Sequence, residues 1–219
     1  VYNADCLEGM KQYPDKWFDL AVVDPPYGIG ATATIGKGDK RSGREKQEKW
    51  GGKSWDNERP SAEYFKELVR VSKNQIIFGG NYFSDLLPAS RCWIVWDKMQ
   101  RVNQADAELA WASYKSSVRV YQYHCSKLQG FLNPNRFHPT EKPVSLYEWL
   151  YKNYLPNGGR VIDTHGGSMS NLIAGIKAGN IEMTVFEIDT DYYKDAKIRV
   201  ENFQAQGNLF GTSHNIIWH

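Results

Sequence analysis

Short apolar runs alternate along the chain with segments in which apolar residues recur at a helical spacing. The clearest run is Phe18–Val23, which is uniformly apolar from its third residue and stops directly before Asp24. A strand buried on both faces of a sheet has this pattern, because neither face meets water. We expect further strands at the similar runs Gln75–Phe78, Cys92–Trp96, Arg160–Ile162 and Met183–Phe186.

Helical segments lie between these runs. Their apolar residues recur every three or four positions in Ala62–Val71, Val144–Tyr154, Ser170–Ala178 and Asp189–Phe203. Strands that alternate with helices predict an α/β domain built on a mainly parallel sheet. Apolar and polar residues alternate in Val118–His124. This run therefore predicts an antiparallel strand at the edge of the sheet.

The length and composition of the chain are typical of one globular domain. The chain has 219 residues, of which 41% are hydrophobic and 24% charged, and it contains no internal repeat. We therefore treat residues 1–219 as a single domain. No apolar run approaches the roughly 20 residues of a membrane span, and no leader precedes the first strand, so we expect a cytoplasmic protein.

The cysteines and histidines do not form metal-binding patterns. The three cysteines are widely separated without a C-x-x-C pair, and the five histidines form no H-x-x-x-H pattern. We therefore expect no disulfide framework and no metal. The net charge of +2 says little about a nucleic-acid partner, so any such prediction must come from local clusters of charge.

The tetrapeptide Asp24-Pro25-Pro26-Tyr27 follows the first apolar run. Two prolines end the strand and remove two N–H donors, which leaves a carboxylate, free carbonyl oxygens and an aromatic ring side by side. The exocyclic amine of a nucleobase is a poor nucleophile because its lone pair is delocalised into the ring. If Asp24 and the carbonyl of Pro25 accept its two N–H groups, the nitrogen becomes tetrahedral and can attack a methyl sulfonium. Tyr27 could stack on a base that has left the duplex. Taken alone, the tetrapeptide also fits a turn that merely ends a strand.

A glycine-rich turn follows the strand expected at Arg160–Ile162. Its glycines let a ligand approach the backbone, and the next helix offers free N–H groups. Glu187 ends the next strand about twenty residues later, where an acidic side chain commonly binds ribose hydroxyls. The pattern predicts a site for an adenosine-containing cofactor, although it lacks the full G-x-G-x-x-G of dinucleotide sites. A strand–helix unit without a ligand is the alternative.

Two further segments are informative. His138-Pro139-Thr140-Glu141-Lys142-Pro143 precedes a helix and would alone indicate only a helix start. The segment Gly28–Pro60 is rich in glycine and then in basic residues, and loops of this length are usually functional or disordered. Its cations predict DNA binding, with a solvated surface as an equally good interpretation; they include Lys37, Lys40, Arg41, Arg44, Lys49 and Lys53.

Together these motifs resemble those of the β-group amino-methylating (N6-adenine/N4-cytosine) DNA methyltransferases, in particular the phage-type DNA adenine methylases. Further similar segments are Ala4–Glu8, Gly79–Phe83, Trp93–Lys98 and Ala105–Trp111. The tetrapeptide precedes the H-P-T-E-K-P motif, which precedes the glycine turn, and this is the circularly permuted order of the β group. The resemblance implies the class I S-adenosylmethionine-dependent methyltransferase fold, an α/β fold with helices on both faces of a seven-stranded, mostly parallel sheet. One inserted strand would be antiparallel, and Val118–His124 is our candidate for part of that hairpin.

The resemblance also implies roles for individual residues. The glycine turn would line S-adenosylmethionine through Asp163, Thr164, His165, Gly167 and Ser168. Glu187 would hold the ribose, and Asp5 and Cys6 would lie near the adenine. Thr140 and Lys142 would flank the methionine end, which Asp24 would also border. The target base would be held by Asp24, Pro25, Pro26 and Tyr27.

The chain departs from the family pattern in two places. Met169 replaces a glycine of the turn, and we expect it within the first turn of the following helix, where it would cost little. The region between Tyr114 and His138 is shorter than the roughly 50 residues of a separate recognition domain. Specificity must then be short or relaxed, or come from the basic loop or from a second subunit, as in a homodimer.

The leading functional hypothesis is methylation of N6 of adenine in double-stranded DNA, in a phage or restriction-modification setting. Asp at the first position of the tetrapeptide favours adenine in this family. N4-cytosine methylation, a non-catalytic DNA-binding subunit with the same fold, and RNA as the substrate are the alternatives.

Overall fold

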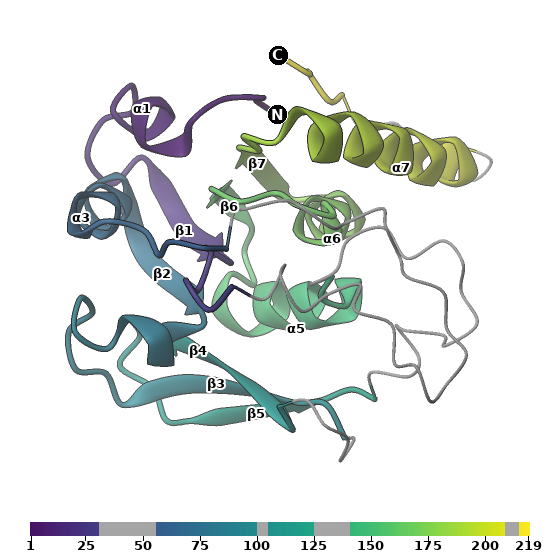
Figure 1. The fold of residues 1–219 in the computed structure, drawn as a ribbon. Coiled ribbons are helices and arrows are strands. Elements are labelled where there is room, and N and C mark those ends of the chain that lie inside the picture. Colours follow the sequence, from purple (N-terminus) through teal and green to yellow (C-terminus); the bar gives the residue numbers. More distant parts are fainter. Residues whose placement is uncertain (31–55, 100–104, 125–140, 209–214) are drawn as a thin grey trace, which may run out of the picture.

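The computed structural model describes residues 1–30, 56–99, 105–124, 141–208 and 215–219. In this part of the chain, seven strands form one sheet in the order β5-β3-β4-β2-β1-β6-β7 (Figure 1). The strands are β1 (Phe18–Val23), β2 (Ser72–Phe78), β3 (Cys92–Asp97), β4 (Ala107–Ala112), β5 (Arg119–Gln122), β6 (Gly159–Asp163) and β7 (Ile181–Val185). The five strands predicted from continuous apolar runs are therefore present; β1 has the predicted bounds, and the ends of the other four differ by at most three residues.

The directions of the strands confirm the expected sheet and correct one assignment. β4 runs antiparallel to both of its neighbours, β2 and β3, whereas all the other pairs are parallel. The prediction of an antiparallel strand at Val118–His124 was wrong: β5 lies at the edge but pairs in parallel with β3, with Val120 opposite Val95. The alternating pattern reflects the exposed position of β5, where Val118 and Val120 remain in solvent, and exposure does not fix direction.

Helices cover both faces of the sheet. The helical segments are α1 (Cys6–Met10), α3 (Ala62–Val71), the 3-10 turn η2 (Gly80–Phe83), α5 (Val144–Tyr154), α6 (Ser170–Ala178) and α7 (Thr190–Asn208). α1 and α3 lie on one face, and α5 and α6 lie on the other, with α7 packed beyond α6 (Figure 1). Among the described residues, no helix is long and apolar enough to cross a membrane.

The burial of β1 explains its continuous apolar sequence. Leu20 and Val22 belong to the core on the side of α5 and α6. Ala21 and Val23 belong to the core on the side of α1 and α3. Successive side chains of a strand point to opposite faces, so a strand covered on both faces needs apolar residues at every position.

The fold places two of the predicted motifs side by side. β1 and β6 are parallel neighbours, with Ala21 opposite Ile162, so their carboxyl ends lie together. From these two strands the chain continues in opposite directions, from β1 through α3 to β2 and from β6 through α6 to β7. Such a change of direction opens a crevice at the carboxyl ends of the strands, where α/β proteins bind ligands.

Candidate active site

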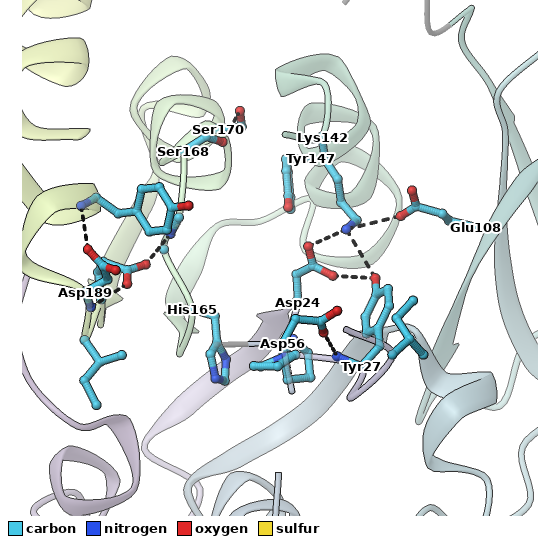
Figure 2. A pocket seen from close by; sticks show the side chains of 18 residues that line it. Asp24, Tyr27, Asp56, Glu108, Lys142, Tyr147, His165, Ser168, Ser170 and Asp189 are labelled. Atoms are coloured by element: carbon cyan, nitrogen blue, oxygen red, sulfur yellow. Dashed lines mark hydrogen bonds and ion pairs between the residues drawn. The ribbon is translucent and has the colours of Figure 1, made fainter. Parts of the chain in front are cut away.

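A pocket of about 380 Å³ lies at the carboxyl ends of β1 and β6 (Figure 2). It is lined by the whole tetrapeptide, by the glycine turn and by the residues that follow β7. Its volume falls within the range of small-molecule sites, roughly 300–1,000 Å³. The structure thus brings the catalytic and cofactor motifs predicted from the sequence into one cavity.

Asp24 is held in this pocket by two donors. Tyr27 donates its hydroxyl to Asp24 Oδ1 at 2.6 Å, and Lys142 Nζ donates to Asp24 Oδ2. Burial raises the pKa of Asp24; the Lys142 ammonium acts in the opposite direction, and the Glu108 carboxylate adds to the rise. The two contacts fix the orientation of the carboxylate, and each oxygen keeps a second lone pair with which it can accept a further hydrogen bond.

The backbone of the tetrapeptide is anchored by Asp56. Its Oδ1 accepts the N–H of Tyr27 at 2.8 Å and the N–H of Gly28 at 3.2 Å. Asp56 is buried and also lines the pocket. Asp56 carries no signal in the sequence, because it is distant from the tetrapeptide along the chain and only folding brings it beneath the turn.

The ring of Tyr27 is packed between aromatic and glycine neighbours. It stacks on Tyr82, with ring centroids 4.9 Å apart and an interplanar angle of 15°. Gly79 has φ +67°, and a Cβ built there would lie only 2.2 Å from Cε1 of Tyr27. The glycine therefore serves both the left-handed backbone and the close approach of the ring.

Lys142 connects the tetrapeptide to β4. Its Nζ lies 3.2 Å from Glu108 Oε2, and Lys98 Nζ lies 2.7 Å from Glu108 Oε1. Burial alone would lower the pKa of Lys142, but the Asp24 and Glu108 carboxylates outweigh it and raise that pKa. Glu108 was missed as a site residue. A single charge in the otherwise apolar run AELAWA was the signal that could have revealed it.

Glu187 joins the two loops of the predicted cofactor site. Its Oε2 accepts the N–H of Gly167 at 2.8 Å, and its Oε1 accepts the N–H of Asp189 at 2.9 Å. His165, Gly167 and Ser168 line the pocket with Glu187, as expected. Burial lowers the pKa of His165 to about 4, so this side chain is neutral at physiological pH.

Asp163 and Thr164 lie behind the pocket wall rather than in the lining. Asp163 accepts the N–H of His165 at 3.1 Å and the amide of Asn171 at 2.9 Å, and burial raises its pKa to about 7. The Thr164 hydroxyl bonds to the Tyr64 hydroxyl at 2.7 Å and to His165 Nδ1 at 2.9 Å. Both residues therefore support the turn in this structure.

Other predicted residues lie outside the lining or outside the described residues. Asp5 caps α1 by accepting the N–H of Glu8, and burial raises the pKa of Cys6 to about 12, with a smaller contribution from Glu187. Neither residue lines the pocket. The remaining predicted site residues belong to segments that the structure does not describe: Lys37, Lys40, Arg41, Arg44, Lys49, Lys53 and Thr140.

The expectation that Met169 lies within the first turn of the following helix was wrong. It is the N-cap of α6 and has a left-handed backbone with φ +58°. Its side chain is fully buried in the core between α6, α7 and β7 and packs behind Gly166, without lining the pocket itself. The side chain therefore leaves the pocket open, but its backbone adopts a conformation that favours glycine.

This conformation predicts an unusual order of stabilities. Met169→Ala and Met169→Gly both lose a buried side chain, at a cost of about 2–4 kcal/mol. Alanine also keeps a Cβ in the left-handed region, so we expect Met169→Ala to be less stable than Met169→Gly by about 1 kcal/mol. Urea denaturation of the two variants measures the difference. If the glycine variant were the less stable, as at ordinary helix positions, this account of Met169 would be wrong.

Several residues of the pocket lining were not among the predicted site residues. Besides Asp56 and Glu108, the lining includes Ile29, Tyr147, Gly166, Ser170, Ile188, Asp189 and Tyr192. Carboxylate side chains thus lie at both ends of the cavity. Between them lies the glycine turn, where Gly166 and Gly167 have no side chains to cover the backbone. Among the described residues, no group of three or more His, Cys, Asp or Glu side chains is arranged to hold a metal ion.

Comparison with known proteins gives the fold a wider context. No family model matches the chain. The candidate methylase YubD of Escherichia coli (strain K12) is 23% identical over 221 aligned positions, which cover 92% of this chain and 90% of YubD. M1.HpyAVI, solved in complex with S-adenosylmethionine, superposes with a TM-score of 0.54 at 19% identity, over 90% of this chain and 97% of that one.

Two further solved structures agree with this fold. The PvuII DNA methyltransferase, which is cytosine-N4-specific, has a TM-score of 0.57 at 13% identity, covering 98% of this chain and 86% of its own. The chain has the class I methyltransferase fold. The candidate DNA modification methylase TTHA0409 of Thermus thermophilus, solved with S-adenosylmethionine, gives a TM-score of 0.55 at 16% identity, over 92% and 94% of the two chains.

Proposed function

We propose that this chain is a DNA methyltransferase that transfers a methyl group from S-adenosylmethionine to an exocyclic amine of a base. The observation that carries the proposal is the position of Asp24 and Tyr27. They line the same pocket as the glycine turn and Glu187, so the proposed amine acceptor and the proposed nucleoside-binding residues share one cavity. The solved structures with the same fold include two bound to S-adenosylmethionine.

The chemistry of the pocket fits S-adenosylmethionine. Glu187 and Asp189 at one end offer acceptors suited to ribose hydroxyls, and the Gly166–Gly167 backbone lets a ligand approach closely. A sulfonium cation suits a cavity that carries carboxylates at both ends. We assign the cofactor to the end of the pocket that carries Glu187 and Asp189. Asp5 and Cys6 are the residues proposed near its adenine, and Thr140 and Lys142 are those proposed near its methionine portion.

Asp24 and Pro25 activate the amine in this proposal. Asp24 and the Pro25 carbonyl oxygen accept its two N–H groups, so the nitrogen lone pair leaves conjugation with the ring. When bound, S-adenosylmethionine supplies an electrophilic methyl group. The N–C bond forms as the S–C bond breaks, and the methylated nitrogen gives a proton to Asp24, from which it passes to water. Tyr27 holds the base by stacking, after the base has left the duplex.

Adenine N6 is our choice of target, with cytosine N4 as the alternative. An Asp at the first position of the tetrapeptide supports adenine, whereas the cytosine-N4-specific PvuII enzyme shares the fold. The partner is double-stranded DNA, and the basic segment that contains Lys37, Lys40, Arg41 and Arg44 is the proposed contact with its phosphates.

Transfer of labelled methyl groups tests the reaction directly. The protein is incubated with methyl-tritiated S-adenosylmethionine and either random-sequence duplex DNA or RNA, and the label on each polymer is counted. The proposal predicts label on DNA. DNA binding without transfer by a protein that binds the cofactor would instead support the rival hypothesis, a non-catalytic DNA-binding subunit with this fold.

Glu187→Gln should weaken S-adenosylmethionine binding by about 10- to 100-fold. Replacing a charged acceptor by a neutral one costs about 1.5–3 kcal/mol per hydrogen bond, and the amide also presents an N–H toward donors. Isothermal titration calorimetry measures the dissociation constant. Glu182→Gln, an exposed position on β7, is the control and should bind as the wild type does. Equal affinity in all three proteins would remove Glu187 from the cofactor site.

A further inference from the structure

Four alternating charges form a chain that ends on the proposed amine acceptor. Lys98 pairs with Glu108. Glu108 in turn pairs with Lys142, and Lys142 with Asp24 (Figure 2). The exposed fractions of the four side chains are low, at 12% for Lys98, 23% for Glu108, 3% for Lys142 and 21% for Asp24. The four residues come from separate segments, following β3, on β4, preceding α5 and following β1.

Stability does not explain a chain of charges in which Lys142 is buried and the other three side chains are partly buried. Removing two opposite charges from water costs several kcal/mol per ion, and apolar side chains of similar size often stabilise a fold equally well or better. Charges gathered beside a pocket, with pKa values moved by one another, are instead typical of functional sites. Glu108 and Lys142 both line the pocket that contains Asp24.

We propose that Glu108 is a positioning residue that shares the Lys142 ammonium with Asp24 and thereby sets how strongly Asp24 accepts the amine hydrogen. This inference rests on the proposed function, because it assigns Asp24 the role of amine acceptor. Lys142 is the link, since its single Nζ contacts both carboxylates.

The Lys142 ammonium divides its positive charge between two carboxylates, those of Asp24 and Glu108. Lys142 has three N–H donors. Two of them form hydrogen bonds, to Asp24 Oδ2 and to the Tyr27 hydroxyl at 3.4 Å, and the ammonium also forms an ion pair with Glu108, whose Oε2 lies 3.2 Å from Nζ. Without the Glu108 charge, Lys142 would pair with Asp24 alone and draw electron density from the carboxylate that must accept the amine. Glu108 therefore keeps Asp24 a stronger acceptor.

The charges around Asp24 determine in which direction the pKa of Asp24 should change when the Glu108 charge is removed. The groups that face Asp24 are Tyr27 on its own loop, Lys142 before α5, Glu108 on β4, Tyr147 on α5, Tyr64 on α3 and Asp163 after β6. Among them, the Glu108 carboxylate raises the pKa of Asp24, whereas Lys142 lowers it. Removing the Glu108 charge must therefore lower that pKa. Activity that depends on ionised Asp24 would then persist to lower pH.

Glu108→Gln is the variant that tests the proposal, because glutamine keeps the size of the side chain. The pH profile of kcat is measured with saturating S-adenosylmethionine and DNA, beside that of the wild type. We expect kcat on the plateau to fall about tenfold, because Asp24 becomes a weaker and less well-held acceptor. We also expect the acidic limb of the profile to move to lower pH, and the KM for DNA to change little.

Lys98→Met is the matched control. It removes a cation from the same chain but leaves both Glu108 and Lys142 in place, so the acidic limb should stay where it is or move to higher pH. An acidic limb that stays at the wild-type position in Glu108→Gln would overturn the proposal, even if kcat falls, because a merely structural role predicts loss without a shift. If the wild type transfers no methyl groups, the proposed function fails instead.

Discussion

Replacing Asp24 by alanine should lower kcat by about 10²–10⁴-fold, while the affinity for S-adenosylmethionine stays within a few-fold of the wild type. Asp24 is the carboxylate that Tyr27 and Lys142 hold in place at the end of β1. Without it, the amine keeps its lone pair in the ring and loses its proton acceptor. Asp24→Asn should retain part of the activity, because one oxygen can still accept.

Single-turnover transfer and calorimetric binding of the cofactor together measure this effect. Glu108 remains as a partner for Lys142 in the alanine variant, so the buried ammonium is not left without a countercharge and the fold should persist. Circular dichroism provides the check on folding. Near-normal transfer by a folded Asp24→Ala protein would exclude Asp24 as the amine acceptor.

Gly79→Ala should lower kcat/KM by about 100-fold, although residue 79 does not line the pocket. The new Cβ would lie 2.2 Å from Cε1 and 2.5 Å from Cδ1 of Tyr27, so the ring must move. That movement breaks the stacking on Tyr82 and displaces the hydroxyl that holds Asp24. We also expect a loss of about 1–3 kcal/mol in the free energy of unfolding, from the overpacking and from the positive φ.

Gly179→Ala separates the two causes. Gly179 has φ +75°, close to the φ of +67° at Gly79, but a Cβ there meets no atom within 4 Å. It ends α6, far in sequence from the tetrapeptide. This variant should lose about 1 kcal/mol of stability and keep its activity. If both alanine variants had the same activity, the contact between Gly79 and Tyr27 would not matter for catalysis.

The parts of the fold that could be predicted were those set by local sequence. The run Phe18–Val23 gave the bounds of β1, because burial on both faces requires an unbroken apolar sequence. α3 was predicted equally well from its apolar spacing, and the structure shows that Ser61 caps it. β4 was not identified as a strand, since AELAWA contains alanine and glutamate and becomes a strand only between β2 and β3.

The parts of the site that could not be predicted depend on the order of the strands. Lys142 was assigned to the cofactor from a resemblance, and only the fold shows that it also contacts Asp24 and Glu108. Asp56 reaches the tetrapeptide from beyond a long intervening segment. Met169 illustrates a different limit: the family's glycine at this position was a signal of the left-handed backbone, but only the fold shows that the methionine side chain lies in the core.

The chemical identity of the methylated nucleoside tests the central claim most directly. DNA is incubated with the protein and S-adenosylmethionine that carries a trideuterated methyl group, digested to nucleosides and analysed by mass spectrometry. The account predicts N6-methyladenine with three deuterium atoms. N4-methylcytosine alone would keep the chemistry of the exocyclic amine but overturn the choice of base. Label found only on a ring carbon, as in 5-methylcytosine, would contradict the account.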